Sequence, residues 1–583
     1  MTVRRLAPLA LFLLALLVYL PSLRNGFVYD DWAVVVQNEH LRTAWRWRNL
    51  VSRGYFEAAG ELSYRPLVTL SYRLDSLLWG LRPAGFHLTN TLLHALVALT
   101  FFSLLLACRL PTSAAVAAAV LFAVHPAATE AVNAIGFRED LLAALFVLLA
   151  CRLALSWLST TGRYRTWAYL ALALLAYVLA LLAKESALAL PLLVGLLIIA
   201  PGAGAADSPA PRPPSRSAGL LASVALVTAA YLVLRFALLV NPAEAARGLT
   251  HLGWLQRLFV TSRIFAYELK LLWLPAPLSV DYVVAARAGL APGIGAWPFG
   301  VAAVLGLAAY LLAAWRLRGS AVGLGLGWLL VSWLPASNVY PLAHPLAERY
   351  LYLPLLGGCM LGGLGWAALW HRRALPPGTG PQRGRSAAAA PLALALLVPL
   401  SFALLSVQRT YAWRRAETLW TPVVARFPRS FLGYQNLGAA LQGRGAWDKA
   451  LLSYAQSLAA KPSYAAARHN LATVLLQRHA WQAARREYRR LVAEHPAQAR
   501  SLANLGIAHY GLGEYEPAEA TLRRALALLP DYAEARNNLG LVLAARGRPD
   551  KAHAAYAAAV LRKPGLQGAR ENLRRSLGGY RTR

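Results

Sequence analysis

Long apolar runs alternate with short polar stretches through the first 400 residues of the chain. A membrane-spanning helix needs about 20 mostly apolar residues, so these runs predict an integral membrane domain. The first run is expected to stay as a signal anchor, because no small-residue cleavage site follows it. The eleven predicted spans are 6–22, 87–107, 112–126, 140–158, 167–183, 186–201, 218–240, 298–315, 320–335, 350–370 and 389–407.

The polar segments that follow every second span carry arginine. Short cytoplasmic loops are enriched in Lys and Arg, so this pattern predicts a cytoplasmic N-terminus. An odd number of spans then places everything after residue 407 on the non-cytoplasmic side, together with the long loops 23–86 and 241–297. The arginines that set this orientation are Arg109, Arg163, Arg165, Arg212, Arg216, Arg316, Arg318, Arg372, Arg373, Arg383 and Arg385.

From about residue 408 the apolar runs give way to a helical pattern with many charges. The dipeptide Asn-Leu and a proline each recur every 34 residues, which is the tetratricopeptide period. The expected fold class is therefore all-α, with a polytopic membrane domain over 1–407 and a lead-in helix over 408–430. Four repeats and a capping helix are expected over 431–583.

Composition agrees with a membrane protein that has basic polar parts. The 583 residues are 58% hydrophobic with a mean hydropathy of +0.44, yet the formal net charge is +33. The three cysteines lie in apolar runs, so no disulfide framework is expected. A basic solenoid could bind nucleic acid, but the predicted side of the membrane holds none. Attraction to anionic lipid headgroups is favoured instead.

Charged residues gather at the predicted external ends of the spans. Asp30 and Asp31 follow the first span in NGFVYDDW, although two adjacent carboxylates repel and resist losing water. Each charge alone is typical of an interfacial anchor or a salt bridge, but acids and bases from four loops suit chemistry on a lipid-linked phosphate. The other members are Arg65 in SYRPL, His125, Glu130, Arg138, Glu139 and Asp140 in HPAATEAVNAIGFRED, Lys184 and Glu185 in LAKES, and His344, Glu348 and Arg349 in HPLAERYLYLP.

The ordered motifs GFVYDDW, SYRPLVTLSYRLD, GFHLTNTLLHAL, HPAATEAV, LLAKES, YELKLLWLPAPLSVDY and AERYLYLP, followed by the repeats, resemble one known family. It is the transmembrane-and-TPR protein O-mannosyltransferase family, of the GT-C type. The resemblance implies a polyprenyl-phosphate sugar donor, an acidic motif in the first external loop and transfer to Ser/Thr hydroxyls. A Gly-Arg-x-Asp pattern of the family reads Gly136-Phe137-Arg138-Glu139-Asp140 here. The composition is typical of a bacterium, so an inner-membrane location and a carrier other than dolichol are expected.

The resemblance also assigns roles to the charged residues. It makes Asp30 the general base of an inverting sugar transfer, while Asp31 would orient the acceptor. The same pair could coordinate a divalent cation such as Mg²⁺ or Mn²⁺, although related enzymes include metal-independent ones. The expected phosphate-binding residues are Lys184, Arg138, Arg349 and Arg65. Support of the pocket is expected from His125, Glu130, Glu185, Asp140 and Glu348.

An asparagine recurs at one position in the first helix of each repeat. An amide both donates and accepts, so a row of them could bind the backbone of an extended peptide acceptor. The alternative is that these residues cap local helix contacts. Arg468, Arg536 and Arg570, two positions earlier, would add positive charge near the same groove. The row consists of Asn436, Asn470, Asn504, Asn538 and Asn572.

Two functions other than an enzyme fit parts of this pattern. A non-catalytic membrane scaffold would anchor the repeats, but one span would suffice for that. A transporter or flippase for a lipid-linked sugar would use many spans, but its charges should lie near the membrane midplane rather than at one face. The sequence therefore favours a membrane glycosyltransferase whose partners are a lipid-linked donor, a protein acceptor and the membrane.

Overall fold

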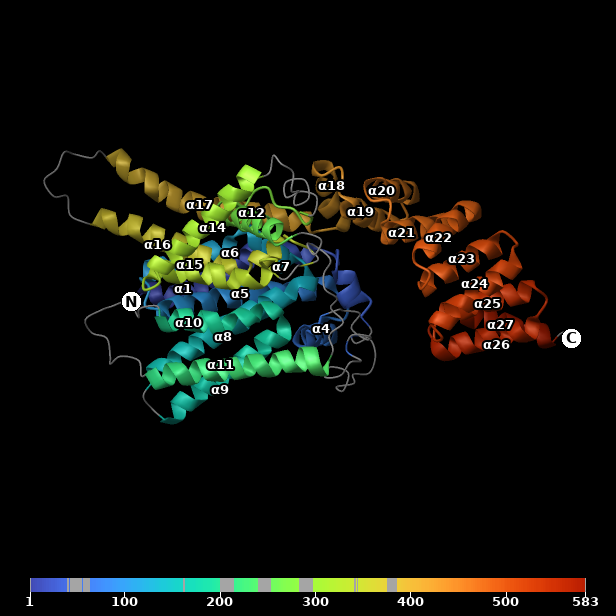
Figure 1. The fold of residues 1–583 in the computed structure, drawn as a ribbon, viewed down its shortest axis with the longest axis horizontal. Coiled ribbons are helices and arrows are strands. Elements are labelled where there is room, and N and C mark those ends of the chain that lie inside the picture. Colours follow the sequence, from blue (N-terminus) through green and yellow to red (C-terminus); the bar gives the residue numbers. More distant parts are fainter. Residues whose placement is uncertain are drawn as a thin grey trace. The chain divides into compact units, whose positions relative to one another are not determined.

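The chain is described as a computed structural model that covers residues 2–38, 41, 55, 63–160, 163–199, 214–239, 253–282, 297–339, 342, 344–374 and 385–581. These residues form helices, turns and irregular segments, without a strand among them, and the predicted all-α class is confirmed (Figure 1). The chain divides into two compact units, Met1–Leu419 and Trp420–Arg583. We call them the membrane unit and the repeat unit.

Among the described residues of the membrane unit, six helical segments are long and apolar enough to cross a bilayer, and a bent pair, α6 with η4 and α7, makes a seventh. The unit is therefore an integral membrane domain, as the hydropathy pattern predicts. These segments are built from α1 (Thr2–Tyr19) with η1 (Leu20–Arg24), α5 (Pro83–Ala107), α6 (Thr112–Val124), η4 (Pro126–Ala128), α7 (Thr129–Asn133), η5 (Ile135–Phe137) with α8 (Arg138–Ser159), α9 (Arg163–Ala183), α11 (Pro214–Leu232) with η7 (Val233–Leu238), and α14 (Trp297–Arg316).

Four shorter apolar helices coincide with the remaining four predicted spans. The predicted boundary after residue 407 falls inside α17 (Arg385–Ala412), the last of these helices, which continues for five more residues. The structure thus has an apolar helix at each predicted span, although only six or seven are long enough by length and composition. The shorter helices are η6 (Glu185–Ala189) with α10 (Leu190–Ile199), α15 (Ala321–Trp333) with η9 (Leu334–Ala336), α16 (Pro354–Ala374) and α17 (Arg385–Ala412).

Small residues let the central helices of the membrane unit approach closely. A Cβ atom on Gly363 of α16 would lie 2.4 Å from the backbone oxygen of Ala114 in α6. One on Gly357 would lie 2.7 Å from the backbone oxygen of Gly325 in α15. Such small-residue contacts are typical of helix packing in membranes, where close backbone approach replaces the hydrophobic driving force.

Both long loops predicted on the external side contain helices that the hydropathy pattern does not predict. Among its described residues, the first holds α4 (Pro66–Trp79) and the short turn η2 (Trp32–Val36). The second holds α12 (Trp254–Trp273), which packs against α14. Four charged residues lower the hydropathy of α12, although its apolar face, with Val260, Ile264 and Phe265, is buried.

The repeat unit is a series of antiparallel helix pairs that begin 34 residues apart. The first helix of each pair packs on the second, and the first helices of successive repeats also contact each other. α18 (Ala416–Arg426) precedes them within the expected lead-in segment. The first helices are α19 (Phe431–Gly443), α21 (Ala465–Gln477), α23 (Ala499–Gly511), α25 (Ala533–Ala545) and the final α27 (Gln567–Arg581); the second helices are α20 (Trp447–Ala460), α22 (Trp481–Glu494), α24 (Tyr515–Leu528) and α26 (Pro549–Arg562).

The turn inside each repeat requires one residue with a left-handed backbone. Gly445, Gly513 and Gly547 supply it with φ of 74°, 76° and 71°. The second repeat instead places His479 there, with φ of 58°. Because a Cβ atom is crowded in this conformation, the second repeat carries strain that the other three avoid.

Candidate functional site

The acidic loop after the first span holds two carboxylates in different surroundings. Asp31 is fully buried, and its two oxygens accept backbone N–H groups from Val28 at 3.0 Å and Gly136 at 2.7 Å. Asp30 is exposed, and among the described residues its carboxylate makes no hydrogen bond or ion pair. Asp31 therefore fixes the loop, and Asp30 keeps its oxygens available.

Gly136 brings the start of α8 directly against this loop. A Cβ atom at this position would lie 3.3 Å from Cβ of Asp30 and 3.4 Å from Cγ2 of Val34. Only a residue without a side chain fits here without displacing its neighbours, and its N–H is the donor that holds Asp31. Gly136 therefore joins the acidic loop to the GFRED segment that the sequence singled out.

Both carboxyl groups are harder to ionise than ordinary aspartates. Surrounding protein reduces the hydration of Asp30 and raises its pKa to about 6, against the opposing charge of Arg349; Glu139 and Glu130 add to the rise. Burial raises the pKa of Asp31 to about 7, against the N–H groups of Val28 and Gly136. A carboxylate with a pKa near the operating pH suits general-base catalysis, and Asp30 is the one that is accessible.

Three acids and three cations form a continuous ionic network beside this loop. The Nζ atom of Lys184 lies 2.7 Å from both oxygens of Asp140 and 3.2 Å from Glu139. Arg65 pairs with Glu139 and, at 3.1 Å, with Glu185. Arg235 in η7 extends the network to the other oxygen of Glu185 at 2.6 Å. The predicted residues from three separate motifs are thus in direct contact.

Arg349 is paired with Glu130 and stays close to the acidic loop. Its Nη1 lies 2.7 Å from Oε1 of Glu130, and its backbone N–H donates to Oε2 at 2.9 Å. The guanidinium lies over the ring of Phe137 with 4.1 Å to the centroid. Among described residues, its Nε and Nη2 form no hydrogen bond, so Arg349 keeps donors for a ligand.

Glu348 joins three segments that are distant in the sequence. Its Oε1 accepts from the backbone N–H of Ser279 at 2.6 Å, from the hydroxyl of Tyr282 at 2.9 Å and from Nη2 of Arg409 at 3.3 Å. Burial raises the pKa of Glu348 to about 7, with Arg409 opposing the shift. Glu348 therefore ties α17 to the loop after α12.

The last turns of α17 also bind the acidic loop directly. Asn25 donates to the backbone oxygen of Thr410 at 3.2 Å, and the N–H of Gly26 donates to the oxygen of Arg414 at 3.2 Å. Asn133 of α7 donates to the hydroxyl of Thr410 at 3.1 Å. The loop that carries Asp30 is thus held at one end by α8 and at the other by α17.

Two predicted site residues are engaged in packing instead. Arg138 is fully buried, and its three nitrogens bind Asn90 at 2.7 Å, Ser71 at 3.3 Å, and Asp75 at 2.5 Å together with the oxygen of Phe86. The ring of His125 caps its own turn through the N–H of Ala127 and contacts the oxygen of Leu272 at 3.0 Å. This geometry favours a structural part for both side chains over contact with a phosphate or sugar.

Sequence reasoning missed Arg235, Arg409, Ser279 and Tyr282. The two arginines had a usable signal, because each is a lone charge within or just beyond a predicted span. Ser279 and Tyr282 lie in the motif YELKLLWLPAPLSVDY, but their contribution depends on where the loop after α12 folds, which the motif does not predict.

No group of three or more His, Cys, Asp or Glu side chains arranged around a metal position occurs in the described part of the chain. Both oxygens of Asp31 already accept backbone N–H groups, which leaves Asp30 as the open carboxylate of the pair. Of the pair, Asp30 is therefore the carboxylate that remains open toward an Mg²⁺ or Mn²⁺ ion.

The asparagines of the repeats occupy the first helices, and they are not uniformly available. Asn504 donates to the hydroxyl of Tyr488 at 2.9 Å, and Asn572 donates to Asn537 at 2.9 Å. The amide nitrogen of Asn436 is buried without a partner among the described residues. All five are half-buried, and contact between successive first helices places them along one row: Asn436, Asn470, Asn504, Asn538 and Asn572.

Arg468 does not add free charge beside this row, contrary to expectation, whereas Arg536 forms no ion pair with a described residue and keeps its charge. Arg468 is buried, pairs with Glu487 at 3.0 Å and also donates to the oxygen of Pro462. Arg536 donates to the oxygen of Pro530 at 2.6 Å in the equivalent way. Both bind the turn that precedes their own repeat.

Comparison with known proteins identifies the repeats and a set of related membrane-type transferases. The family model described as tetratricopeptide repeat matches residues 469–531 and 503–566. Protein O-mannosyl-transferase Tmtc1 of Drosophila melanogaster is 29% identical over 525 residues, covering 74% of this chain and 59% of its own. Protein O-mannosyl-transferase TMTC4 of Mus musculus is 28% identical, with 75% and 64% covered. Mouse TMTC3 is 26% identical, with 73% and 48% covered.

The chain is thus similar to protein O-mannosyl-transferases over about three quarters of its length, and its C-terminal part matches the tetratricopeptide repeat. The resemblance seen in the ordered motifs is thereby confirmed. The chain spans only about half to two thirds of the length of these relatives. Among solved structures, a thermophilic TPR protein of Thermus thermophilus is 22% identical, with 32% of this chain and 94% of that one covered and a TM-score of 0.25.

Proposed function

We propose that this protein is a membrane glycosyltransferase that moves a sugar, mannose or a similar hexose, from a polyprenyl phosphate to a Ser/Thr hydroxyl of a protein. The observation that carries the proposal is an accessible, unpaired carboxylate, Asp30, beside a network of acids and cations in the described part of the membrane unit. Relatives named protein O-mannosyl-transferases support the same reaction class.

Asp30 is the general base of the proposed reaction. Its carboxylate takes the hydroxyl proton while the hydroxyl oxygen attacks the anomeric carbon of the sugar. The bond between that carbon and the phosphate oxygen breaks, and its electron pair leaves with the polyprenyl phosphate. Attack opposite to the leaving group inverts the anomeric configuration. Positioned general bases typically contribute about 10²–10⁴-fold to a rate.

Arg349 is the residue best suited to stabilise the departing phosphate. Two of its guanidinium nitrogens keep donors that no described residue binds, and charge-assisted bonds from Arg to phosphate are strong. The Nζ atom of Lys184 lies within 3.2 Å of carboxylate oxygens of Asp140 and Glu139, and Arg65 pairs with Glu139. Lys184 and Arg65 are therefore assigned to holding the network in place, and either would have to leave a carboxylate to reach the phosphate. No step of this mechanism uses a metal.

The repeat unit is proposed to present the acceptor protein. Tetratricopeptide units stack into extended surfaces suited to binding polypeptides. The side chain of Asn470 forms no hydrogen bond with the described residues, whereas the unpartnered amide nitrogen of Asn436 is buried. Asn470 is therefore the strongest member of the proposed peptide-binding row.

The proposal is tested with purified full-length protein in lipid nanodiscs. Polyprenyl-phosphate mannose and other polyprenyl-phosphate hexoses are offered with Ser/Thr peptides and with an unfolded protein, in buffers with EDTA or with Mg²⁺. The expected result is a mass gain of one hexose on the acceptor, in EDTA as well as in Mg²⁺. A folded preparation that transfers no hexose from any of these donors would contradict the proposal, and lipid movement between leaflets without transfer would favour a flippase.

A further inference from the structure

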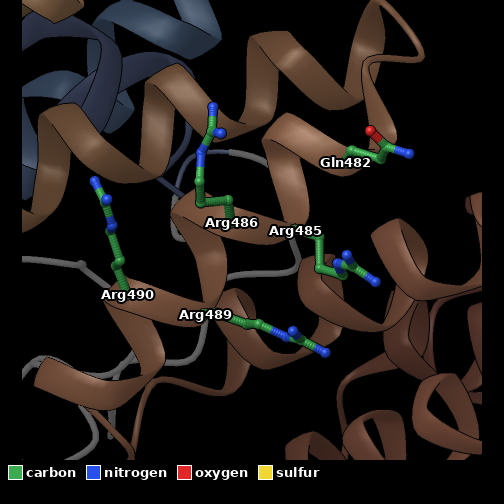
Figure 2. Close-up of a pocket in the computed structure, with 5 residues that line it drawn as sticks. All are labelled: Gln482, Arg485, Arg486, Arg489 and Arg490. Atoms are coloured by element: carbon green, nitrogen blue, oxygen red, sulfur yellow. The ribbon is translucent and has the colours of Figure 1, made fainter.

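The second helix of the second repeat carries an unusual concentration of arginine. Arg485, Arg486, Arg489 and Arg490 line a hollow of 480 Å³ together with Gln482, and all five belong to α22. Figure 2 shows Arg486 and Arg490 extending from one side of the helix and Arg485 and Arg489 from another. We call this surface the α22 arginine face.

The repeat fold does not require these arginines. Residues four apart on a helix are neighbours, and like charges at that spacing destabilise it, so the two Arg–Arg pairs cost helix stability. The equivalent positions, 34 residues away, are mostly uncharged in the other repeats. They are Leu451, Leu452, Ala455 and Gln456 in α20, Glu519, Ala520, Arg523 and Arg524 in α24, and His553, Ala554, Ala557 and Ala558 in α26.

The positive charge of the α22 arginine face is poorly compensated. Glu487 is largely buried and is bound at 3.0 Å by Arg468 from α21. Arg486 and Arg490, with side chains 67% and 62% exposed, approach Glu487 only to 3.8 and 3.7 Å. Arg489 has no ion pair with a described residue, and Arg485 alone is paired closely, with Glu514. Three guanidinium groups therefore remain available to an external anion.

We propose that the α22 arginine face binds the phosphate headgroups of anionic membrane lipids. Guanidinium groups match phosphate oxygens with paired hydrogen bonds. The chain supplies its own membrane, since the apolar helix α17 ends at Ala412, α18 begins at Ala416 and α19 begins at Phe431. Such short connections keep headgroups at a high effective concentration around the repeat unit. Bound headgroups would hold this repeat against the lipid surface.

The test uses full-length protein in nanodiscs of phosphatidylcholine, mixed with separate vesicles. Vesicles of phosphatidylcholine with 30 mol% phosphatidylglycerol are compared with pure phosphatidylcholine vesicles by cosedimentation. Each arginine near an anionic surface contributes about a factor of five in affinity, so Arg486→Gln with Arg490→Gln should weaken binding to the anionic vesicles roughly 25-fold. Binding should also weaken in high salt.

The matched control is Arg574→Gln with Arg575→Gln, which removes the same charge from arginines of α27. This variant should bind the anionic vesicles within about threefold of wild type, since it leaves the α22 arginine face intact. Failure of the wild-type protein to bind anionic vesicles would overturn the proposal, as would equal loss in both variants. Binding of a poly-glutamate peptide in place of the anionic vesicles would overturn it in favour of an acidic protein partner.

Discussion

Asp30 and Asp31 show how neighbouring residues of one type acquire different tasks. The difference comes from N–H groups of Val28 and Gly136 that close around Asp31 and leave Asp30 open. The sequence predicts that an acidic pair lies beside the first span. It does not predict which acid is buried, because that depends on a contact with Gly136, 105 residues away.

The raised pKa of Asp30 predicts the pH dependence of transfer. A base must be ionised, so the rate should fall about tenfold per pH unit as the pH decreases below about 6. A raised pKa means that the folded state binds the proton more tightly than the unfolded state, so protonation of Asp30 does not itself destabilise the fold. The measurement is kcat/KM between pH 5 and 8, with thermal unfolding followed at each pH. A flat profile in folded protein would contradict this assignment.

Arg138 shows that the role of a residue can depend on which helices meet around it in the folded membrane unit. One guanidinium joins the start of α8 to Asp75 of α4 and Asn90 of α5. From its motif, Arg138 is expected to bind the donor phosphate. Only the folded arrangement of three helices reveals that its nitrogens bind protein.

Replacement of Arg138 should therefore act on stability. Arg138→Gln leaves Asp75 buried without its charged partner, which typically costs about 3–5 kcal/mol. Thermal unfolding in detergent should show a large decrease in Tm, and Asp75→Asn in the same chain should restore part of it. If Arg138→Gln kept the wild-type Tm and raised only KM for the lipid donor, Arg138 would instead bind the phosphate.

The turn of the second repeat offers an independent test of local strain. A left-handed residue other than glycine costs about 1–2 kcal/mol of folding stability. Glycine avoids this strain, but its greater freedom in the unfolded chain costs about 0.5–1 kcal/mol. His479→Gly should therefore stabilise the repeat unit by about 0.5–1 kcal/mol in urea unfolding of the full chain. Gly513→Ala is the matched control at the equivalent turn, and it should destabilise. Loss of stability in His479→Gly would show that the contact of the His479 ring with Trp481, with ring centroids 4.9 Å apart, outweighs the strain.

Hydropathy and period predict most elements, because apolar runs and a 34-residue repeat are local properties of the chain. Hydropathy does not predict α12, because four charged residues reduce its mean hydropathy while its other face is buried. These residues are Arg257, Arg263, Glu268 and Lys270. The sequence also does not identify Arg235 and Arg409 as site residues. Their partners, Glu185 and Glu348, come from other motifs and meet them only in the folded unit.

The whole molecule combines a membrane unit and a repeat unit, and the arginine pattern predicts the side on which the repeats lie. A reporter fused after residue 583 should be located outside the cytoplasm, and one inserted into 374–388 should be cytoplasmic. The two reporters control for each other in the same cells. A cytoplasmic position for residue 583 would contradict the orientation and would separate the repeats from acceptors on the other side.

The central claim is that Asp30 is the base of a sugar transfer carried out by the membrane unit. The most direct measurement is the single-turnover rate of Asp30→Asn and wild-type protein in nanodiscs, with a polyprenyl-phosphate hexose and a Ser/Thr peptide at saturating concentrations. The asparagine keeps the shape of the side chain and removes its basicity. We predict a rate about 10²–10⁴-fold lower, with unchanged Tm and unchanged affinity for the donor. Transfer by Asp30→Asn at the wild-type rate would contradict the account.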